Sequence, residues 1–140
     1  MIVLAGTWTD GVADVGVVRS TAIEAPALER FTVPSDGHPM AVWARRPAAP
    51  RFAVLLVHGG PESQSRPGFD PFTQFLVNEL GYVVIAPNVR GSSGYGKSFL
   101  KLDDGTLRED SVRDIGALLV WIGLQKSLDA KRVVVMGGSY

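Results

Sequence analysis

The chain has 140 residues, 46% hydrophobic and 20% charged, which is enough apolar material for the core of about one domain. Its 14 Lys and Arg balance 14 Asp and Glu, so no net charge favours nucleic acid or an anionic membrane surface as a partner. The absence of cysteine excludes disulfides and thiolate metal sites. No apolar run approaches the roughly 18 residues of a membrane span, and the first residues lack the basic region of a signal peptide. We therefore expect a cytoplasmic protein without metal or other cofactor.

The first third of the chain predicts β-structure. Residues 1 to about 30 give the weakest pattern, in which Val15 to Arg19 fits a short strand. After them, Phe31–Val33 and Met40–Ala44 flank the tripeptide Ser35-Asp36-Gly37. Two β-prone runs around an Asp-Gly turn predict a hairpin.

From residue 51 onward, strands and helices alternate. Continuous apolar runs predict three strands that are covered on both faces, at Ala53–Val57, Tyr82–Ala86 and Arg132–Met136. Strands that alternate with helices through short connections are typical of a mostly parallel sheet with right-handed crossovers. The fold class predicted from these patterns is α/β.

Two helices are predicted between these strands. The first starts at Asp70-Pro71, which has the N-cap and N1 chemistry of a helix start, and its expected apolar face is Phe72, Phe75, Leu76 and Leu80. The second starts at a sequence like a capping box, Ser111 with Asp114 three residues later. Its expected apolar face is Val112, Ile115, Leu119 and Ile122.

The last five residues resemble a nucleophile motif. Met136-Gly137-Gly138-Ser139-Tyr140 fits a strand that leads into Gly-x-Ser-x-Gly, with the final glycine beyond the sequence. In that motif the serine sits on a sharp turn between strand and helix, and the acid and histidine of the site follow it in chain order. The alternatives for this stretch alone are an ordinary Gly-Gly-Ser turn and the opening of a nucleotide-binding loop.

A second motif, His58-Gly59-Gly60-Pro61, directly follows the first apolar strand. In α/β-hydrolases one backbone N–H of the oxyanion hole comes from the loop after the third strand, and the other from the residue after the nucleophile. If the hairpin supplies strands one and two, Ala53–Val57 is the third strand, and the Gly-Gly loop falls where this role requires it. We expect His58 itself to be structural rather than a general base.

The third motif is the glycine-rich segment Pro87 to Lys97, at the carboxyl end of the second apolar strand. That edge of a sheet is where α/β proteins bind ligands. Arg90 is a candidate to hold a carboxylate or to donate to loop carbonyls. The spacing of glycine and lysine does not match a phosphate-binding P-loop.

Together these motifs resemble the prolyl oligopeptidase family of serine peptidases, most closely its acylaminoacyl-peptidase and dipeptidyl-peptidase-like branch. The resemblance covers residues 29 to 140 and rests on four motifs in order, which are His58 to Glu62, Asn88 to Gly96, Arg108 to Val112 and Gly137 to Tyr140. It implies a truncated α/β-hydrolase fold, a hairpin plus parallel sheet with flanking helices, that ends at the nucleophile elbow. Residues 1–28 are then expected to be a remnant of a preceding propeller and linker.

The resemblance also implies roles for individual residues. Ser139 is expected to be the nucleophile, and the backbone N–H groups of Tyr140 and Gly60 are expected to bind the oxyanion. The substrate is expected to be a short peptide, hydrolysed through an acyl-enzyme. The family's catalytic Asp and His lie beyond residue 140, so we expect a fragment that is inactive by itself.

Two other functions stay open at this point. One is an esterase or lipase with the same fold. A His-Gly-Gly-Gly loop is expected for that class, and this chain has Pro61 where the last glycine of the loop would be. The other is a non-catalytic truncated product. In the hydrolase strand order 1-2-4-3-5, Arg132–Met136 is an exposed edge, and self-association through it is expected.

Overall fold

The computed structural model describes residues 2–9, 12–20, 26–50, 52–60 and 62–139. Two strands near the N-terminus, β1 (Ile2–Thr9) and β2 (Val12–Ser20), pair with each other in antiparallel fashion. The predicted short strand at Val15 to Arg19 lies within β2, whereas β1 was not predicted. The division of the chain at residue 28 stays a prediction.

The other strands form one five-stranded sheet, ordered β3-β4-β6-β5-β7. In family terms this is the predicted order 1-2-4-3-5. The hairpin strands β3 and β4 and the pair β4–β6 are antiparallel, and β5 is parallel to both β6 and β7. The bounds of the strands are β3 Leu28–Ser35, β4 His38–Arg45, β5 Phe52–Val57, β6 Tyr82–Asn88 and β7 Val133–Gly137.

The hairpin turn confirms the Asp-Gly prediction. Asp36 and Gly37 both have positive φ, 44° and 79°, between the paired residues Ser35 and His38. Positive φ at both central residues is the requirement of a type I′ turn, whose twist matches that of the strands. Asp tolerates this conformation better than most residues with a side chain, and Gly adopts it freely.

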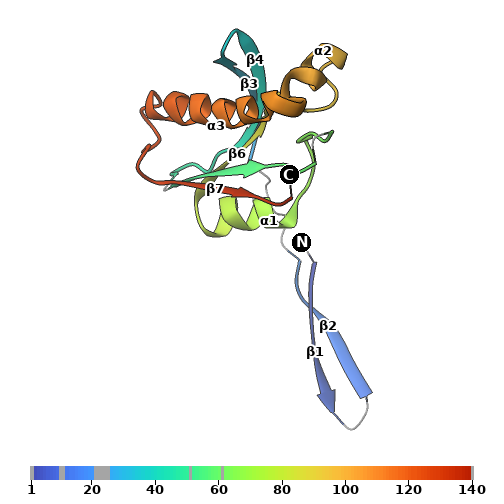
Figure 1. Ribbon diagram of the computed structural model, residues 1–140. Coiled ribbons are helices and arrows are strands. Elements are labelled where there is room, and N and C mark those ends of the chain that lie inside the picture. Colours follow the sequence, from blue (N-terminus) through green and yellow to red (C-terminus); the bar gives the residue numbers. More distant parts are fainter. Residues whose placement is uncertain (1, 10–11, 21–25, 51, 61, 140) are drawn as a thin grey trace.

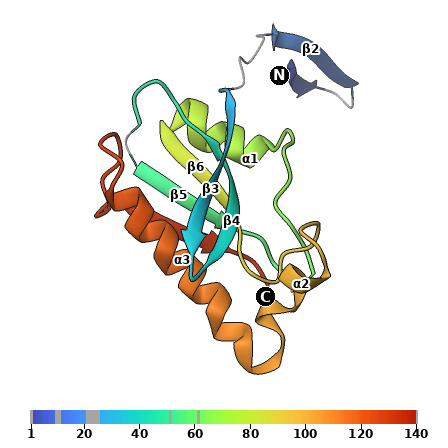
Figure 2. The same ribbon diagram turned by 90° about the horizontal axis from the view of Figure 1, so that it is seen from above.

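Helices cover both faces of the sheet, as Figures 1 and 2 show, with α3 on one face and α1 on the other. Because side chains alternate along a strand, Leu55 and Ile85 join the core beneath α3, together with Leu118 and Ile122 of that helix. Their neighbours Val54 and Val84 pack on the opposite face. That smaller cluster is completed by Leu76 and Val77. The two apolar runs are therefore covered on both faces, as predicted.

The helical segments are short, apart from α3. They are α1 Pro71–Gln74, the π-helix η1 Phe75–Glu79, α2 Lys97–Leu100, the 3₁₀ turns η2 Lys101–Asp103 and η3 Gly105–Leu107, and α3 Arg108–Gly123. Within the described ranges of the chain, no helix is long and apolar enough to cross a membrane.

The start of α1 is predicted correctly, and its buried face is predicted correctly only at Leu76. Asp70 is the N-cap and accepts a hydrogen bond of 2.7 Å from the N–H of Thr73. Phe72 and Phe75, expected in the core, are about half exposed, and Leu80 is 37% exposed. The buried residues of this segment are Gln74, Leu76 and Val77. The helix changes after one turn into a π-helix, so a spacing of 3.6 residues per turn no longer gives the inward face.

The start of α3 is predicted wrongly. The helix begins at Arg108, so Ser111 lies inside its first turn and donates a hydrogen bond of 2.8 Å to the carbonyl of Arg108 instead of capping the end. Asp114, expected to complete the capping box, is buried. Ile122 is buried and Ile115 packs against the core, as expected. Val112 is 65% exposed and Leu119 is 37% exposed, with Leu118 in the core instead.

The prediction for the last strand is wrong in one respect. β7 forms at the sheet edge, as the strand order 1-2-4-3-5 predicts, and pairs in parallel with β5. Its side chains are not covered on both faces, because Val134 and Val135 are each about half exposed and Met136 is 39% exposed. A long apolar run predicts a strand, but it does not distinguish a central strand from an edge strand.

Candidate active site

Ser139 stands directly after β7, in a backbone conformation that residues with a side chain rarely adopt. Its φ is 62°, and in the described residues only Asp36 shares a positive φ without being glycine. The left-handed region places Cβ close to the carbonyl oxygen and costs roughly 1–2 kcal/mol. A strained, exposed serine at the end of a strand is the geometry of a nucleophile elbow. The sharp turn predicted at Ser139 is therefore present.

The Gly-Gly loop after β5 lies against this serine. The parallel register places Val57 opposite Gly137, so the loops that follow the two strands leave the sheet side by side. A Cβ added to Gly59 would collide with the carbonyl oxygen of Gly138 and would come within 3.0 Å of the Cβ of Ser139. Only glycine allows this approach.

A cavity of about 160 Å³ opens between these loops and α3. Ser139, Gly60 and His58 line it from the sheet edge, and Val112 and Ile115 line it from the helix. Gly60 has a φ of 77°, again a conformation that suits glycine. The structure thus brings together two of the three predicted site residues, Ser139 and Gly60. The third, Tyr140, lies outside the described residues.

His58 is engaged in the structure of the loops. Its Nε2 lies 2.9 Å from the hydroxyl of Ser92, and its Nδ1 lies 3.3 Å from the carbonyl oxygen of Gly59. Both ring nitrogens therefore have partners within the protein. This arrangement agrees with the prediction that His58 is structural, since neither nitrogen is left to take a proton from Ser139.

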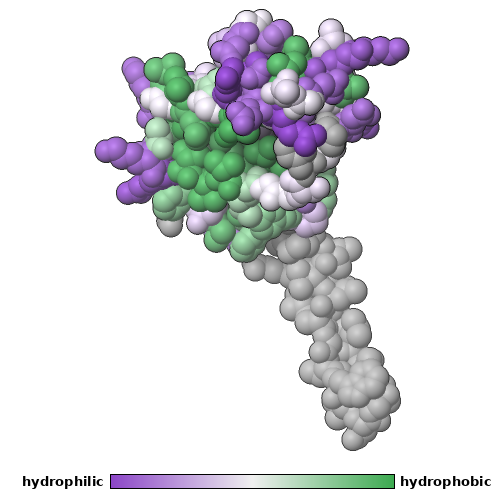
Figure 3. Space-filling model, viewed as in Figure 1, coloured by the Kyte–Doolittle hydropathy of each residue, from purple (hydrophilic) through white to green (hydrophobic). Residues whose placement is uncertain are grey.

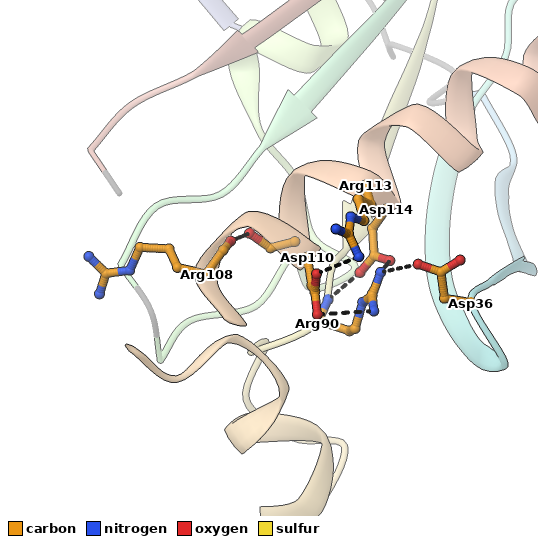
Figure 4. Close-up of polar contacts among 7 residues, drawn as sticks. Asp36, Arg90, Arg108, Asp110, Arg113 and Asp114 are labelled. Carbon is orange, nitrogen blue, oxygen red and sulfur yellow. Dashed lines mark hydrogen bonds and ion pairs between the residues drawn. The ribbon is translucent and has the colours of Figure 1, made fainter. Parts of the chain in front are cut away.

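Arg90 lies at the centre of an ionic cluster whose inner pair, with Asp114, is buried (Figure 4). Its side chain is 5% exposed and that of Asp114 is 1% exposed, and their closest ion-pair distance is 2.9 Å. The backbone N–H of Arg90 also donates to Asp114 over 2.6 Å. Asp36 in the hairpin turn lies 3.2 Å from the guanidinium, and Asp110 lies at 3.8 Å.

The aspartates keep Arg90 charged. Burial lowers the pKa of the guanidinium, but the hydrogen bond and charge of Asp114, with help from Asp36 and Asp110, outweigh burial and raise that pKa. The sequence predicted that Arg90 binds a carboxylate or donates to loop carbonyls. In the structure it binds carboxylates of the protein itself, Asp36 in the hairpin and Asp114 in α3.

The glycine-rich loop after β6 is joined to the loop after β5, a link that the sequence did not predict. Asn88 is fully buried and exchanges two hydrogen bonds with the backbone of Ser65, one of 2.7 Å and one of 3.1 Å. Its amide also donates to the hydroxyl of Tyr95 over 2.9 Å. The N–H of Ser93 donates to the carbonyl of Ser63 over 2.8 Å. An Asn at the end of a buried strand is the only signal that could have pointed to this link.

Asp103 is a further residue in the cavity wall that the sequence did not single out. Its carboxylate packs against Gly91, where an added Cβ would collide with it. Burial, and then the charge of Asp104, raise the pKa of Asp103 above its ordinary value. Across the described part of the chain, no group of three or more His, Cys, Asp or Glu side chains is arranged to hold a metal ion.

Sequence comparison places these features in a family. A sequence model of the prolyl oligopeptidase family matches residues 67–140. The chain is 35% identical over 117 residues to dipeptidyl peptidase family member 6 of Caenorhabditis elegans, covering 84% of this chain and 16% of that protein. It is 38% identical over 92 residues to dipeptidyl aminopeptidase BIII of Pseudoxanthomonas mexicana, covering 66% of this chain and 13% of the relative. The chain thus spans about one sixth or less of the length of these relatives.

Solved structures share the fold. The uncomplexed acylaminoacyl peptidase of Pyrococcus horikoshii superposes on 81% of this chain with a TM-score of 0.72 and 22% identity, which covers 19% of that chain. A post-proline cleaving enzyme from Rickettsia typhi superposes on 91% with a TM-score of 0.75 and 20% identity, which covers 20% of its own chain. The strand order and the family match agree, and this chain belongs to the prolyl oligopeptidase family.

Proposed function

We propose that the protein to which this chain belongs is a serine peptidase that hydrolyses short peptides through an acyl-enzyme, with Ser139 as the nucleophile. The observation that carries the proposal is the left-handed backbone of Ser139 in contact with the Gly59-Gly60 loop. The peptidase names of the relatives support peptides as substrates.

In this mechanism Ser139 Oγ attacks the carbonyl carbon of the scissile peptide bond. The carbonyl oxygen becomes an oxyanion, and the backbone N–H groups of Gly60 and Tyr140 are the proposed donors to it. Collapse of the tetrahedral intermediate breaks the C–N bond, releases the amine and leaves the acyl group on Ser139. Water then hydrolyses the ester. Donors placed where negative charge develops are worth roughly 10²–10³ in kcat each.

Proton transfer in this reaction needs a base that the described residues do not supply. The chain has two histidines. His38 begins β4 and His58 is bonded to Ser92 and Gly59. We infer that the base and its acidic partner come from a part of the protein outside these 140 residues.

The proposal is tested by Ser139→Ala in the protein expressed from its own gene at its full encoded length. We expect the wild type to cleave acyl-peptide or dipeptide substrates and to be labelled at Ser139 by a fluorophosphonate, and we expect the variant to lose both properties. Ser111→Ala is the matched control, because Ser111 also lines the cavity but donates to the carbonyl of Arg108. Labelling of another residue would contradict the proposal. Cleavage of esters without peptides would favour an esterase.

The same argument predicts the behaviour of the 140-residue polypeptide by itself. Without a base, the hydroxyl of Ser139 is a weak nucleophile, and loss of the triad histidine in subtilisin costs on the order of 10⁶ in kcat. We expect no measurable hydrolysis of a p-nitrophenyl ester or an acyl-peptide. Turnover that Ser139→Ala abolishes would show that a base is present after all.

A further inference from the structure

The hydroxyl of Ser92 is aimed at His58 from a rigid position. Ser92 is fully buried, and its N–H donates to the carbonyl of Val89 over 3.0 Å. The next residue, Ser93, is bonded through its own N–H to Ser63. The hydroxyl of Ser92 lies 2.9 Å from Nε2 of His58. Its place is therefore set by the backbone on both sides.

The two contacts of His58 select one form of the neutral ring. The carbonyl oxygen of Gly59 can only accept a hydrogen bond, so Nδ1 must carry the proton to bond with it. Nε2 is then without a proton and accepts a hydrogen bond from the hydroxyl of Ser92. The carbonyl of Gly59 thus selects the tautomer, and the hydroxyl of Ser92, which can donate or accept, turns to donate and anchors Nε2.

The contact of Nδ1 reaches the candidate oxyanion hole directly. The carbonyl of Gly59 and the N–H of Gly60 belong to the same planar, trans peptide unit, in which they point in opposite directions. A bond that fixes the carbonyl oxygen therefore also fixes the direction of the N–H. Glycine on both sides of this peptide leaves it free to rotate unless something holds it, and Gly60 already has a φ of 77°.

We propose that Ser92 is a positioning residue that acts through His58. Its hydroxyl anchors Nε2 and so holds the ring where Nδ1–H reaches the carbonyl of Gly59, and the ring in turn holds the Gly59–Gly60 peptide with its N–H available to the oxyanion. This inference rests on the proposed function, and it adds a role for the glycine-rich loop after β6. In this role the loop helps to align the transition-state donors.

The test compares Ser92→Ala with Ser93→Ala in the protein at its full encoded length. Ser93 is the matched control, because its hydrogen bond to Ser63 uses only the backbone N–H. For Ser92→Ala we expect kcat to fall about tenfold with KM changed less than twofold, since an unpaired buried acceptor remains and the lost alignment matters only in the transition state. Ser93→Ala is expected to keep both constants within about twofold of the wild type. Ser92→Cys, which keeps the shape with a weaker donor, is expected to lie in between.

A second measurement separates positioning from general damage. In ¹⁵N-histidine-labelled protein, the nitrogen shifts of His58 are expected to report the Nδ1–H tautomer in the wild type and in Ser93→Ala. In Ser92→Ala we expect the ring to lose this fixed arrangement, so that both nitrogen shifts move towards those of a mixture of the two tautomers. An unchanged tautomer, or an unchanged kcat in Ser92→Ala, would overturn the inference. The activity lost in Ser139→Ala tests the proposed function separately, because that variant leaves the contacts of His58 in place.

Discussion

At Arg90 one guanidinium joins three parts of the chain, the hairpin turn, the loop after β6 and the helix α3. None of these contacts follows from local sequence, since Asp36 and Asp114 lie 54 and 24 residues away along the chain. The pair of Arg90 and Asp114 is buried, so water cannot readily solvate the charge that remains when one partner is removed. Among the three aspartate partners of Arg90, Asp114 is the most buried and lies nearest to the guanidinium.

Asp114→Ala should be strongly destabilising. It removes the partner of both the guanidinium and the backbone N–H of Arg90, and breaking a buried ion pair costs about 3–5 kcal/mol. We expect a loss at the lower end of that range, because Asp36 and Asp110 remain, measured by urea unfolding. Glu29→Ala, which breaks the half-exposed pair with Arg46, should cost about 1 kcal/mol or less. Equal losses in the two variants would show that burial of the pair does not matter.

Asp103 should make the stability of the fold depend on pH. Burial is the main cause that raises its pKa above 3.8, so the folded state binds more protons than the unfolded state in the range above that value. Stability from this residue is therefore lost as pH rises through the raised pKa. Asp103→Asn should stabilise the fold at pH 7, and the gain should fade below pH 3.8. Urea midpoints of both proteins across this range check the sign, and destabilisation by Asn at pH 7 would contradict it.

Among the elements, those with a strong local signal were predictable. The hairpin follows from Asp36-Gly37, and the strands β5 and β6 follow from apolar runs covered on both faces. The start of α1 follows from Asp70 and Pro71. In each case the chemistry of one or two neighbouring residues decides the backbone, so tertiary contacts have little left to change.

The inward faces of the helices were not predictable in the same way. η1 closes with a hydrogen bond of 3.3 Å from the N–H of Leu80 to the carbonyl of Phe75, five residues back, which turns the following side chains away from the α-helical face. In α3 a charged residue, Asp114, takes a core position because Arg90 from a distant loop neutralises it. The pattern of hydrophobic residues along the sequence reveals neither the π-helix nor the partner of Asp114.

The same distinction between local and distant contacts applies to the residues of the candidate site. The sequence predicted that Ser139 and Gly60 lie close together, because their motifs are local and their backbone conformations favour glycine or a sharp turn. It did not predict the partners of Ser92 and Asn88, which lie in another loop. A sequence thus predicts residues of local motifs more readily than hydrogen bonds between distant loops.

Over the whole molecule, the two faces of the sheet are covered unequally. Among the described residues, the core beneath α3 contains eleven buried residues, whereas the cluster on the opposite face contains four. Figure 3 shows apolar side chains gathered on one side of the molecule, where Figure 1 places β7. The exposed hydrophobic residues include Val134, Val135 and Met136 of β7 and the helical residues Phe72 and Phe75.

In the 140-residue polypeptide this arrangement should lead to self-association. β7 pairs with β5 along one side only, so its other side presents backbone N–H and C=O groups beside half-exposed valines, which is a template for a strand of a second copy. We expect dimers or larger species in sedimentation experiments. Val134→Lys should reduce them, because a charge on an edge strand opposes pairing, whereas Val112→Lys at an exposed position of α3 should not. A monodisperse wild-type monomer with a cooperative thermal transition would contradict this expectation.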